Sequence, residues 1–240
     1  MRVCEWVLDR EPPPEPFAFQ VMPGELWMLM GAVDSGRREL IHGMAGLITP
    51  RAGRLELFGC DVARLGLRVR ARLHSQIGVV LEQPGLVPAW SVFENLALLV
   101  RYHRLASNRT VEDYVVDFIE SCRVPRAILS RLACDLSPLE SRWIGLLRAL
   151  ILRPRLLLVS AYLPQETLAA GYDVWAFFSE VVEPMRMAIV VDAGPQALPI
   201  SAATRLLVMD QGTLLAFGSA GELAEHPNPE VRRHARFAHA

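Results

Sequence analysis

A short apolar run, a glycine-spaced loop and a helical segment follow one another and constrain the fold of this chain most strongly. The run covers residues 26–30, the loop begins at Gly31, and the helical pattern covers residues 36–47. Glycine tolerates the backbone angles that a tight strand-to-helix turn requires. The order strand, glycine loop and helix predicts an α/β unit whose helix N-terminus faces the loop.

This loop has the spacing of the phosphate-binding motif G-x-x-x-x-G-K-[ST], but not all of its chemistry. In that motif the backbone N–H groups and the Lys bind phosphates, and the Ser/Thr hydroxyl binds Mg²⁺. All 25 basic residues of this chain are arginine, so an Arg in the Lys place also reflects a chain-wide preference. The candidate nucleotide-binding residues in the loop are Gly31, Asp34, Ser35, Gly36, Arg37 in the Lys place and Arg38 in the hydroxyl place.

Composition narrows the function classes. The formal net charge of -1 over 240 residues argues against a nucleic-acid partner, whose binding surface is usually basic. The four cysteines are far apart, which predicts reduced thiols and no metal site. No apolar run approaches the roughly 20 residues of a spanning helix, so any membrane role is expected to be peripheral.

Strand and helix signals alternate along the rest of the chain. Short apolar runs alternating with helices predict a sheet that is covered on both faces. Residues 91–135 carry mostly helical signals and are expected to form a helical insert. Strand-type segments are expected within residues 1–30 and at 53–59, 77–81, 156–159, 187–191, 205–209 and 213–217, and further helices at 64–75 and 136–152.

The order of these features resembles the ATP-binding subunit of ABC transporters from about residue 20 to the C-terminus. The resemblance is carried by residues 46–61 after the loop, 77–95 as the Q-loop segment, 136–158 as the signature, its helix and the Walker B strand, and Gly212 and Gly218 in a terminal hairpin. It implies a P-loop NTPase-like α/β fold, the ABC nucleotide-binding domain, with an antiparallel N-terminal β-subdomain. One domain is expected over residues 1–240, with the helical subdomain at about 91–135 and a C-terminal extension at about 219–240.

Two segments resemble a narrower group, the Mla-type subunits that serve phospholipid transport with MCE proteins. They are residues 92–97 and residues 218–232, from Gly218 to Arg232. A generic ABC subunit with a chance similarity in its ending remains the alternative.

Several positions that the resemblance makes functional hold other side chains. Ser160 stands where the Walker B carboxylate for Mg²⁺ is expected, Ala161 where a Glu activates water, and Ala193 where a switch His contacts phosphate. No catalytic residue is therefore expected to be intact. The Q-loop place falls on Glu82 or, with a slip of one residue, on Gln83.

The signature L-S-G-G-Q, which binds the nucleotide of the opposite subunit in this family, is also altered. In its place stand Leu136, Ser137, Pro138, Leu139 and Glu140. Pro138 removes an N–H donor, Leu139 crowds the approach, and Glu140 adds negative charge near phosphate.

Charge argues against a metal ion. Arg38 in place of a hydroxyl and Ser160 in place of a carboxylate make the Mg²⁺ place two units more positive. A unit charge 4 Å from a divalent ion contributes about 2 kcal/mol in water and about 8 kcal/mol at an effective dielectric near 20. Mg²⁺ is therefore not expected unless Arg38 turns away to Asp34 or Glu39.

Three interpretations of Arg37 and Arg38 remain open. They form a solvated, locally paired helix start, they bind phosphate directly without metal, or they bind ordinary Mg·ATP. ATP is thus implied by the resemblance and doubtful from the substitutions.

The expected function is a hydrolysis-deficient ATP-binding subunit that serves a membrane lipid transporter as a structural or regulatory component. Its expected location is cytoplasmic, peripheral on the inner membrane. Its expected partners are the membrane permease subunits, docked at 82–105 through Leu86, Val87, Trp90 and Phe93, and an ATP-binding subunit in a homodimer or heterodimer.

Two other functions remain open. The first is a divergent but active ATPase, with Glu166 or Asp192 as the water-activating carboxylate. The second is a stand-alone interaction protein without a permease.

Overall fold

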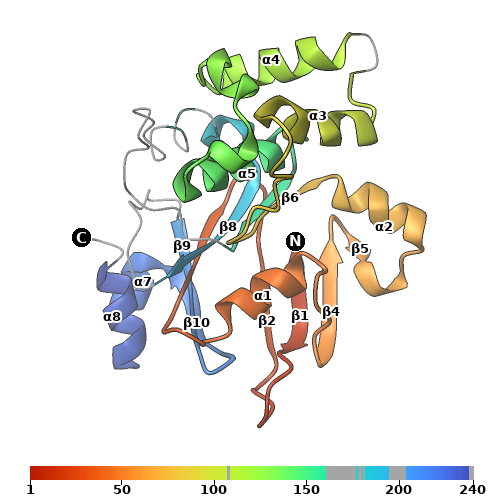
Figure 1. Cartoon of the computed structure of the whole chain (residues 1–240). Coiled ribbons are helices and arrows are strands. Elements are labelled where there is room, and N and C mark those ends of the chain that lie inside the picture. The colour runs from red at the N-terminus through yellow and green to blue at the C-terminus, as the bar shows by residue number, and fades with distance from the viewer. Residues whose placement is uncertain (107–108, 161–176, 178–179, 181, 195–203, 238–240) are drawn as a thin grey trace.

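The fold was examined in a computed structural model, which describes residues 1–106, 109–160, 177, 180, 182–194 and 204–237 (Figure 1). A six-stranded sheet forms its centre, in the order β10-β9-β3-β8-β7-β6. Neighbouring strands among β3, β6, β7, β8 and β9 are parallel, and β10 is antiparallel to β9. The strands are β3 (Leu26–Met30), β6 (Ile77–Val80), β7 (Leu156–Val159), β8 (Ala188–Gly194), β9 (Thr204–Asp210) and β10 (Thr213–Ser219).

A second, antiparallel sheet is built mainly from the N-terminal part of the chain, in the order β2-β1-β4-β5. Its strands are β1 (Arg2–Val7), β2 (Phe17–Gln20), β4 (Ala52–Leu57) and β5 (Cys60–Asp61). Helix α1 (Arg37–Met44) packs in one apolar cluster with residues of both sheets. The helix that follows the glycine loop is thereby fixed on both sides.

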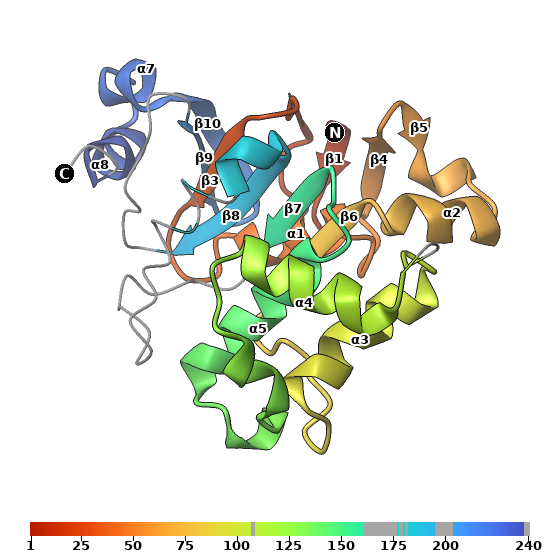
Figure 2. The same ribbon diagram turned by 90° about the horizontal axis from the view of Figure 1, so that it is seen from above.

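Alternation along β3 divides the core in two. Trp27 and Leu29 belong to the cluster that contains α1, whereas Met28 and Met30 belong to the cluster that contains the remaining large helices. Successive side chains of a strand point to opposite faces. The apolar run therefore serves both layers, and Figure 2 shows α3, α4 and α5 on one side of the large sheet with β1 and β4 on the other.

Helices follow the expected positions. Four of them begin with capping boxes, in which a Ser or Thr side chain and an acidic residue three positions later cap each other's backbone N–H. The helices other than α1 are α2 (Leu67–His74), α3 (Val92–Tyr102), α4 (Val111–Ser121), α5 (Pro138–Leu150), α7 (Ala220–Ala224) and α8 (Pro229–Phe237). None of the described helices is long and apolar enough to cross a membrane.

The predicted fold class is confirmed, and the differences concern the ends of elements. The helix expected at 64–75 is divided into a 3₁₀ turn at Val62–Arg64 and α2, with Gly66 in an extended conformation before α2. The helix expected at 36–47 ends at Met44, because Gly46 adopts a left-handed conformation, with φ +73°.

The packing of α1 against β1 predicts the effect of a methyl group. A Cβ at Gly43 would lie 2.5 Å from the ring of Trp6, which is fully buried. We expect Gly43→Ala to lower the free energy of unfolding by about 1–3 kcal/mol through overpacking, measured by urea denaturation. Gly221→Ala in α7 is the matched control, because nothing lies within 4 Å of its Cβ. The control should be neutral or stabilising by up to about 1 kcal/mol, and equal losses in both variants would contradict the assignment.

Candidate functional site

The loop between β3 and α1 approaches the neighbouring strand closely. Gly31 has φ +150°, and a Cβ there would lie 2.3 Å from the carbonyl oxygen of Met209 in β9. Gly36 is the N-cap of α1 with φ 101°, a conformation that suits glycine. The spacing of the two glycines thus reflects two separate backbone requirements of this turn.

A cavity of about 260 Å³ opens at this loop. It combines the candidate phosphate-binding residues with the ends of β7 and β8 and the start of the segment after β6. Of the two residues considered for the Q-loop place, Glu82 lines the cavity and Gln83 does not. The lining residues are Val33, Asp34, Ser35, Gly36, Arg37, Arg38, Glu39, Glu82, Ser160 and Asp192.

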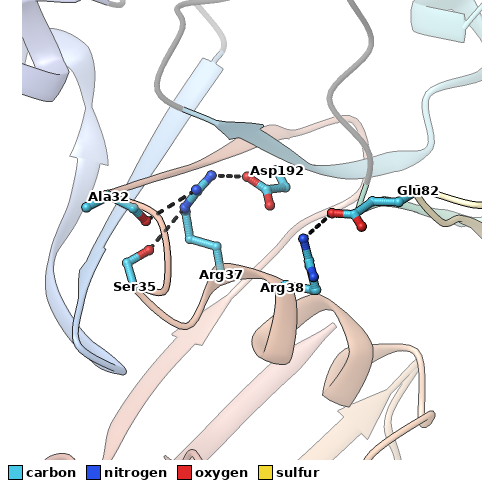
Figure 3. A network of polar contacts seen from close by, with 6 residues as sticks. All are labelled: Ala32, Ser35, Arg37, Arg38, Glu82 and Asp192. Carbon is cyan, nitrogen blue, oxygen red and sulfur yellow. Dashed lines mark hydrogen bonds and ion pairs between the residues drawn. The ribbon is translucent and has the colours of Figure 1, made fainter. Parts of the chain in front are cut away.

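The side chain of Arg37 is buried and is bound by the protein on three sides (Figure 3). Its Nε donates to Ser35 Oγ at 3.1 Å, and Nη2 donates to the carbonyl oxygen of Ala32 at 3.3 Å. Nη1 forms an ion pair with Asp192 of β8. The parallel register of β3 and β8 brings Asp192 beside Leu29, two residues before the loop. The interpretation as a solvated helix start is therefore wrong for Arg37.

Arg38 turns away from the loop to Glu82, with which it forms an ion pair across the cavity (Figure 3). The two side chains are 58% and 49% exposed, so solvent screens the pair. Arg38 therefore does turn away from the loop, but to Glu82 and not to Asp34 or Glu39, the two partners considered above. Glu39 is instead in an ion pair with Arg10, which also donates to the backbone carbonyl oxygen of Asp34 at 2.6 Å.

Ser160 lies at the carboxyl end of β7 and is buried. Its Oγ is 3.4 Å from Nε2 of His42 in α1, a neighbour that the sequence interpretation missed. His42 follows Arg38 by four residues, and this spacing places both on one face of a helix. Ala193 is fully buried in β8, whereas Ala161 and Glu166 lie outside the described residues.

The residues that line the loop cavity have no net positive charge that would attract an anion. Its lining contains two arginines and four carboxylates, three of which, Glu39, Glu82 and Asp192, are in ion pairs with arginine. A phosphate group would have to compete with Asp192 for Arg37. Asp192, considered above as a water-activating base, is held by the same contact.

The altered signature residues cap α5 themselves. Ser137 Oγ accepts from the N–H of Glu140 at 3.2 Å, and Glu140 accepts from the N–H of Ser137 at 2.8 Å. Pro138 occupies the first turn, where its missing N–H costs little. The hydrogen bond from Arg131, followed by that from the Ser137 backbone, lowers the pKa of Glu140 to about 2. Glu140 therefore brings a charge that is already neutralised by Arg131.

A double-mutant cycle tests the tie between the loop and β8. Arg37→Met and Asp192→Asn should each destabilise the protein, because each leaves an oppositely charged, largely buried partner without its counterpart. We expect a coupling energy of about 1–3 kcal/mol from urea unfolding of the two single variants and the double variant. The control cycle, Arg38→Gln with Glu82→Gln, should couple by less than about 1 kcal/mol. Equal coupling in both cycles would contradict the structural role of Arg37.

The pKa of Glu140 predicts an acid sensitivity. Because the folded pKa lies below the ordinary value of 4.5, this stabilisation is full above about pH 4.5 and is lost as pH falls toward about 2. Glu140→Gln should therefore flatten the fall of the melting temperature with pH over this range.

Glu222 provides the matched control for this measurement. It makes the same capping bonds with Ser219 in α7 and forms no ion pair among the described residues. Glu222→Gln should flatten the profile less than Glu140→Gln, and the opposite order would show that Arg131 does not stabilise the charged form.

Comparison with known proteins gives the family. A sequence model of the ABC transporter family matches residues 15–159, more than half of the chain. The methionine import ATP-binding protein MetN of Corynebacterium efficiens is 28% identical over 221 residues, which cover 88% of this chain and 58% of that protein. The oligopeptide transport ATP-binding protein OppD of Mycobacterium tuberculosis is 23% identical and is matched over 90% of this chain and 36% of its own length. The chain thus spans less than two thirds of these relatives.

Solved structures agree in fold. cbiO1 from Clostridium perfringens, part of the ABC transporter complex cbiONQ, superposes with a TM-score of 0.69 at 16% identity and covers 93% of this chain and 90% of its own. The dimeric ATP-binding cassette MJ0796, bound to ADP and Pi, superposes with a TM-score of 0.67 at 14% identity, covering 90% and 97%. Together with the family match, the glycine loop and the two-sheet architecture, these similarities show that the chain belongs to the ABC transporter family.

Proposed function

We propose that this chain is a hydrolysis-deficient ATP-binding-type subunit that serves an ABC transporter as a structural or regulatory component. The observation that carries the proposal is the ion pairing of both loop arginines, Arg37 with Asp192 and Arg38 with Glu82. In these pairs, guanidinium groups that could bind phosphate and carboxylates that could bind a metal ion are bound to each other instead. The fold can remain intact without nucleotide because the protein itself satisfies the loop.

The residues present do not fit a divalent ion in the place that the motif implies. Arg38 brings a guanidinium where a hydroxyl ligand would stand, and Ser160 offers a hydroxyl beside His42 where a carboxylate would stand. A cation in this cavity would also have to displace Arg38 from Glu82. We therefore derive no catalytic step through Mg²⁺.

Partners follow from the family. Membrane permease subunits and a second ATP-binding subunit, identical or not, would bind the chain on the cytoplasmic face of the inner membrane. Of the four apolar residues expected to dock a permease, Trp90 is exposed at 38%, whereas Leu86 and Phe93 pack partly buried against the core. We propose that the docking surface includes Trp90 and Leu98 of α3, which is also exposed.

The narrower proposal is a role in Mla-type phospholipid transport. It rests on the resemblance of residues 92–97, within α3, and of residues 218–232, which include α7 and the start of α8. We treat residues 1–240 as one nucleotide-binding-type domain with the helical subdomain at 91–135 and the extension at 219–240.

A second candidate is an active transport ATPase, which the names of the methionine import and oligopeptide transport relatives favour. In that function Arg37 would leave Asp192 for a phosphate, and Asp192 would become available at the cavity. The Arg37–Asp192 contact is then a resting arrangement of the same site.

Phosphate release separates the two candidates. We expect the chain, alone and in its native complex, to release phosphate from ATP at background rate with or without Mg²⁺. A missing general base and missing charge stabilisation each cost about 10²–10⁴-fold in rate. Turnover by the chain alone that Arg37→Ala abolishes would establish the active enzyme and overturn the proposal. In the complex, a partner subunit without its Walker B carboxylate serves as the control for activity from the partner.

A further inference from the structure

A second cavity lies away from the loop, between α2 and the ends of α3 and α5. Its volume is about 530 Å³, twice that of the loop cavity and within the roughly 300–1,000 Å³ of small-molecule sites. Figure 1 shows α2 below α3 on the same side of the molecule, and we refer to this cavity as the arginine cleft. Arg72 of α2, Arg104 after α3 and Arg153 after α5 all line it.

Arginines are the charged residues that line the arginine cleft, whereas carboxylates outnumber arginines in the lining of the loop cavity. Among the described residues that line it, none is Asp or Glu. None of Arg72, Arg104 and Arg153 forms an ion pair with a described residue, whereas 12 of the 25 arginines of the chain do. Three segments distant in sequence therefore bring uncompensated positive charge to one concave surface.

Helix ends supply only part of a countercharge. The C-terminal ends of α2, α3 and α5 adjoin the cleft, and each carries about half a negative elementary charge. Three such ends offset about half of the three full charges. Compensation of the helix dipoles thus explains why arginine is tolerated here, and still leaves the cleft positive.

Two of the cleft arginines follow a helix in a left-handed backbone conformation. Arg104 and Arg153 have φ +53° and +49°, at positions after a helix where glycine is the common residue. Arg123 and Arg186 adopt the same left-handed conformation elsewhere, so an arginine in this conformation is not by itself a sign of a binding site in this chain. What distinguishes the first two is that both line the same cavity.

We propose that the arginine cleft binds a ligand that carries a phosphate group. Guanidinium groups match phosphate geometry with paired N–H donors, and three of them from different segments can surround one group. Tyr102 lies at the edge of the cleft with 73% of its surface exposed, its ring 4.8 Å from that of His103 in an edge-on contact. This aromatic edge suits the organic part of the ligand, which is a soluble organic phosphate or the headgroup of a phospholipid.

Binding of inorganic pyrophosphate to the full chain, measured by isothermal titration calorimetry at fixed ionic strength, tests the cleft. Arg72→Gln and Arg104→Gln should each weaken binding by about 5–10-fold, as expected for the loss of a charge-assisted contact. Arg68→Gln is the matched control, since Arg68 is exposed on the same helix and does not line the cleft. It should change affinity by less than about 2-fold, the size of a screened long-range effect.

Arg38→Gln distinguishes the two cavities. If pyrophosphate binds in the cleft, this exposed loop variant leaves the affinity unchanged, and the cleft variants should retain the melting temperature of the unaltered chain. The proposal is overturned if pyrophosphate does not bind, if Arg68→Gln weakens binding as much as Arg72→Gln, or if only Arg38→Gln does.

The source of the phosphate group is decided by flotation with phosphatidylcholine vesicles that do or do not contain phosphatidic acid. A headgroup ligand predicts flotation only with phosphatidic acid, lost in Arg72→Gln and Arg104→Gln and retained in Arg68→Gln. Pyrophosphate binding without flotation assigns a soluble ligand. The cleft does not depend on the hydrolysis state of the loop cavity, so active ATP turnover would leave this inference intact.

Discussion

The position of β3 between two parallel neighbours is the constraint on which the site depends. Hydrogen bonding to β8 on one side and β9 on the other fixes where the strand ends. The loop must then turn within a few residues against the carbonyl oxygen of Met209, and α1 must enter a space that is bounded by both sheets. Every side chain of the cavity takes its place from this turn.

This constraint also explains how the site tolerates its unusual residues. The backbone of the loop is held by strand pairing and by the packing of α1, neither of which requires a particular side chain at 37 or 38. A buried guanidinium still needs a partner, because an unpaired charge in such a place costs several kcal/mol. Asp192 supplies it from the adjacent strand. The loop is thus held by packing, and the charge of Arg37 is balanced within the protein itself.

The sequence was sufficient for the order of elements and insufficient for the pairing of charges. The glycine loop, the buried runs and the terminal hairpin depend on short-range patterns, and they are found as expected. The partner of Arg37 lies 155 residues away and that of Arg38 lies 44 residues away, so both pairs depend on the tertiary fold and not on local spacing. Arg131 beside Glu140 and Arg10 beside Glu39 were missed because the members of each pair are nine and 29 residues apart, which is not a helical i,i+3 or i,i+4 spacing. His42 is different, since its four-residue spacing from Arg38 could have placed it at the cavity.

The exposed pair of Arg38 and Glu82 has a mechanical consequence. It joins the first turn of α1 to the segment that leads from β6 toward α3, the part of the chain that we assign to the permease. Here a solvent-screened ion pair makes the connection, and its strength is set by ionic strength, with a screening length of about 8 Å under physiological salt. The strength of this connection therefore falls as the salt concentration rises.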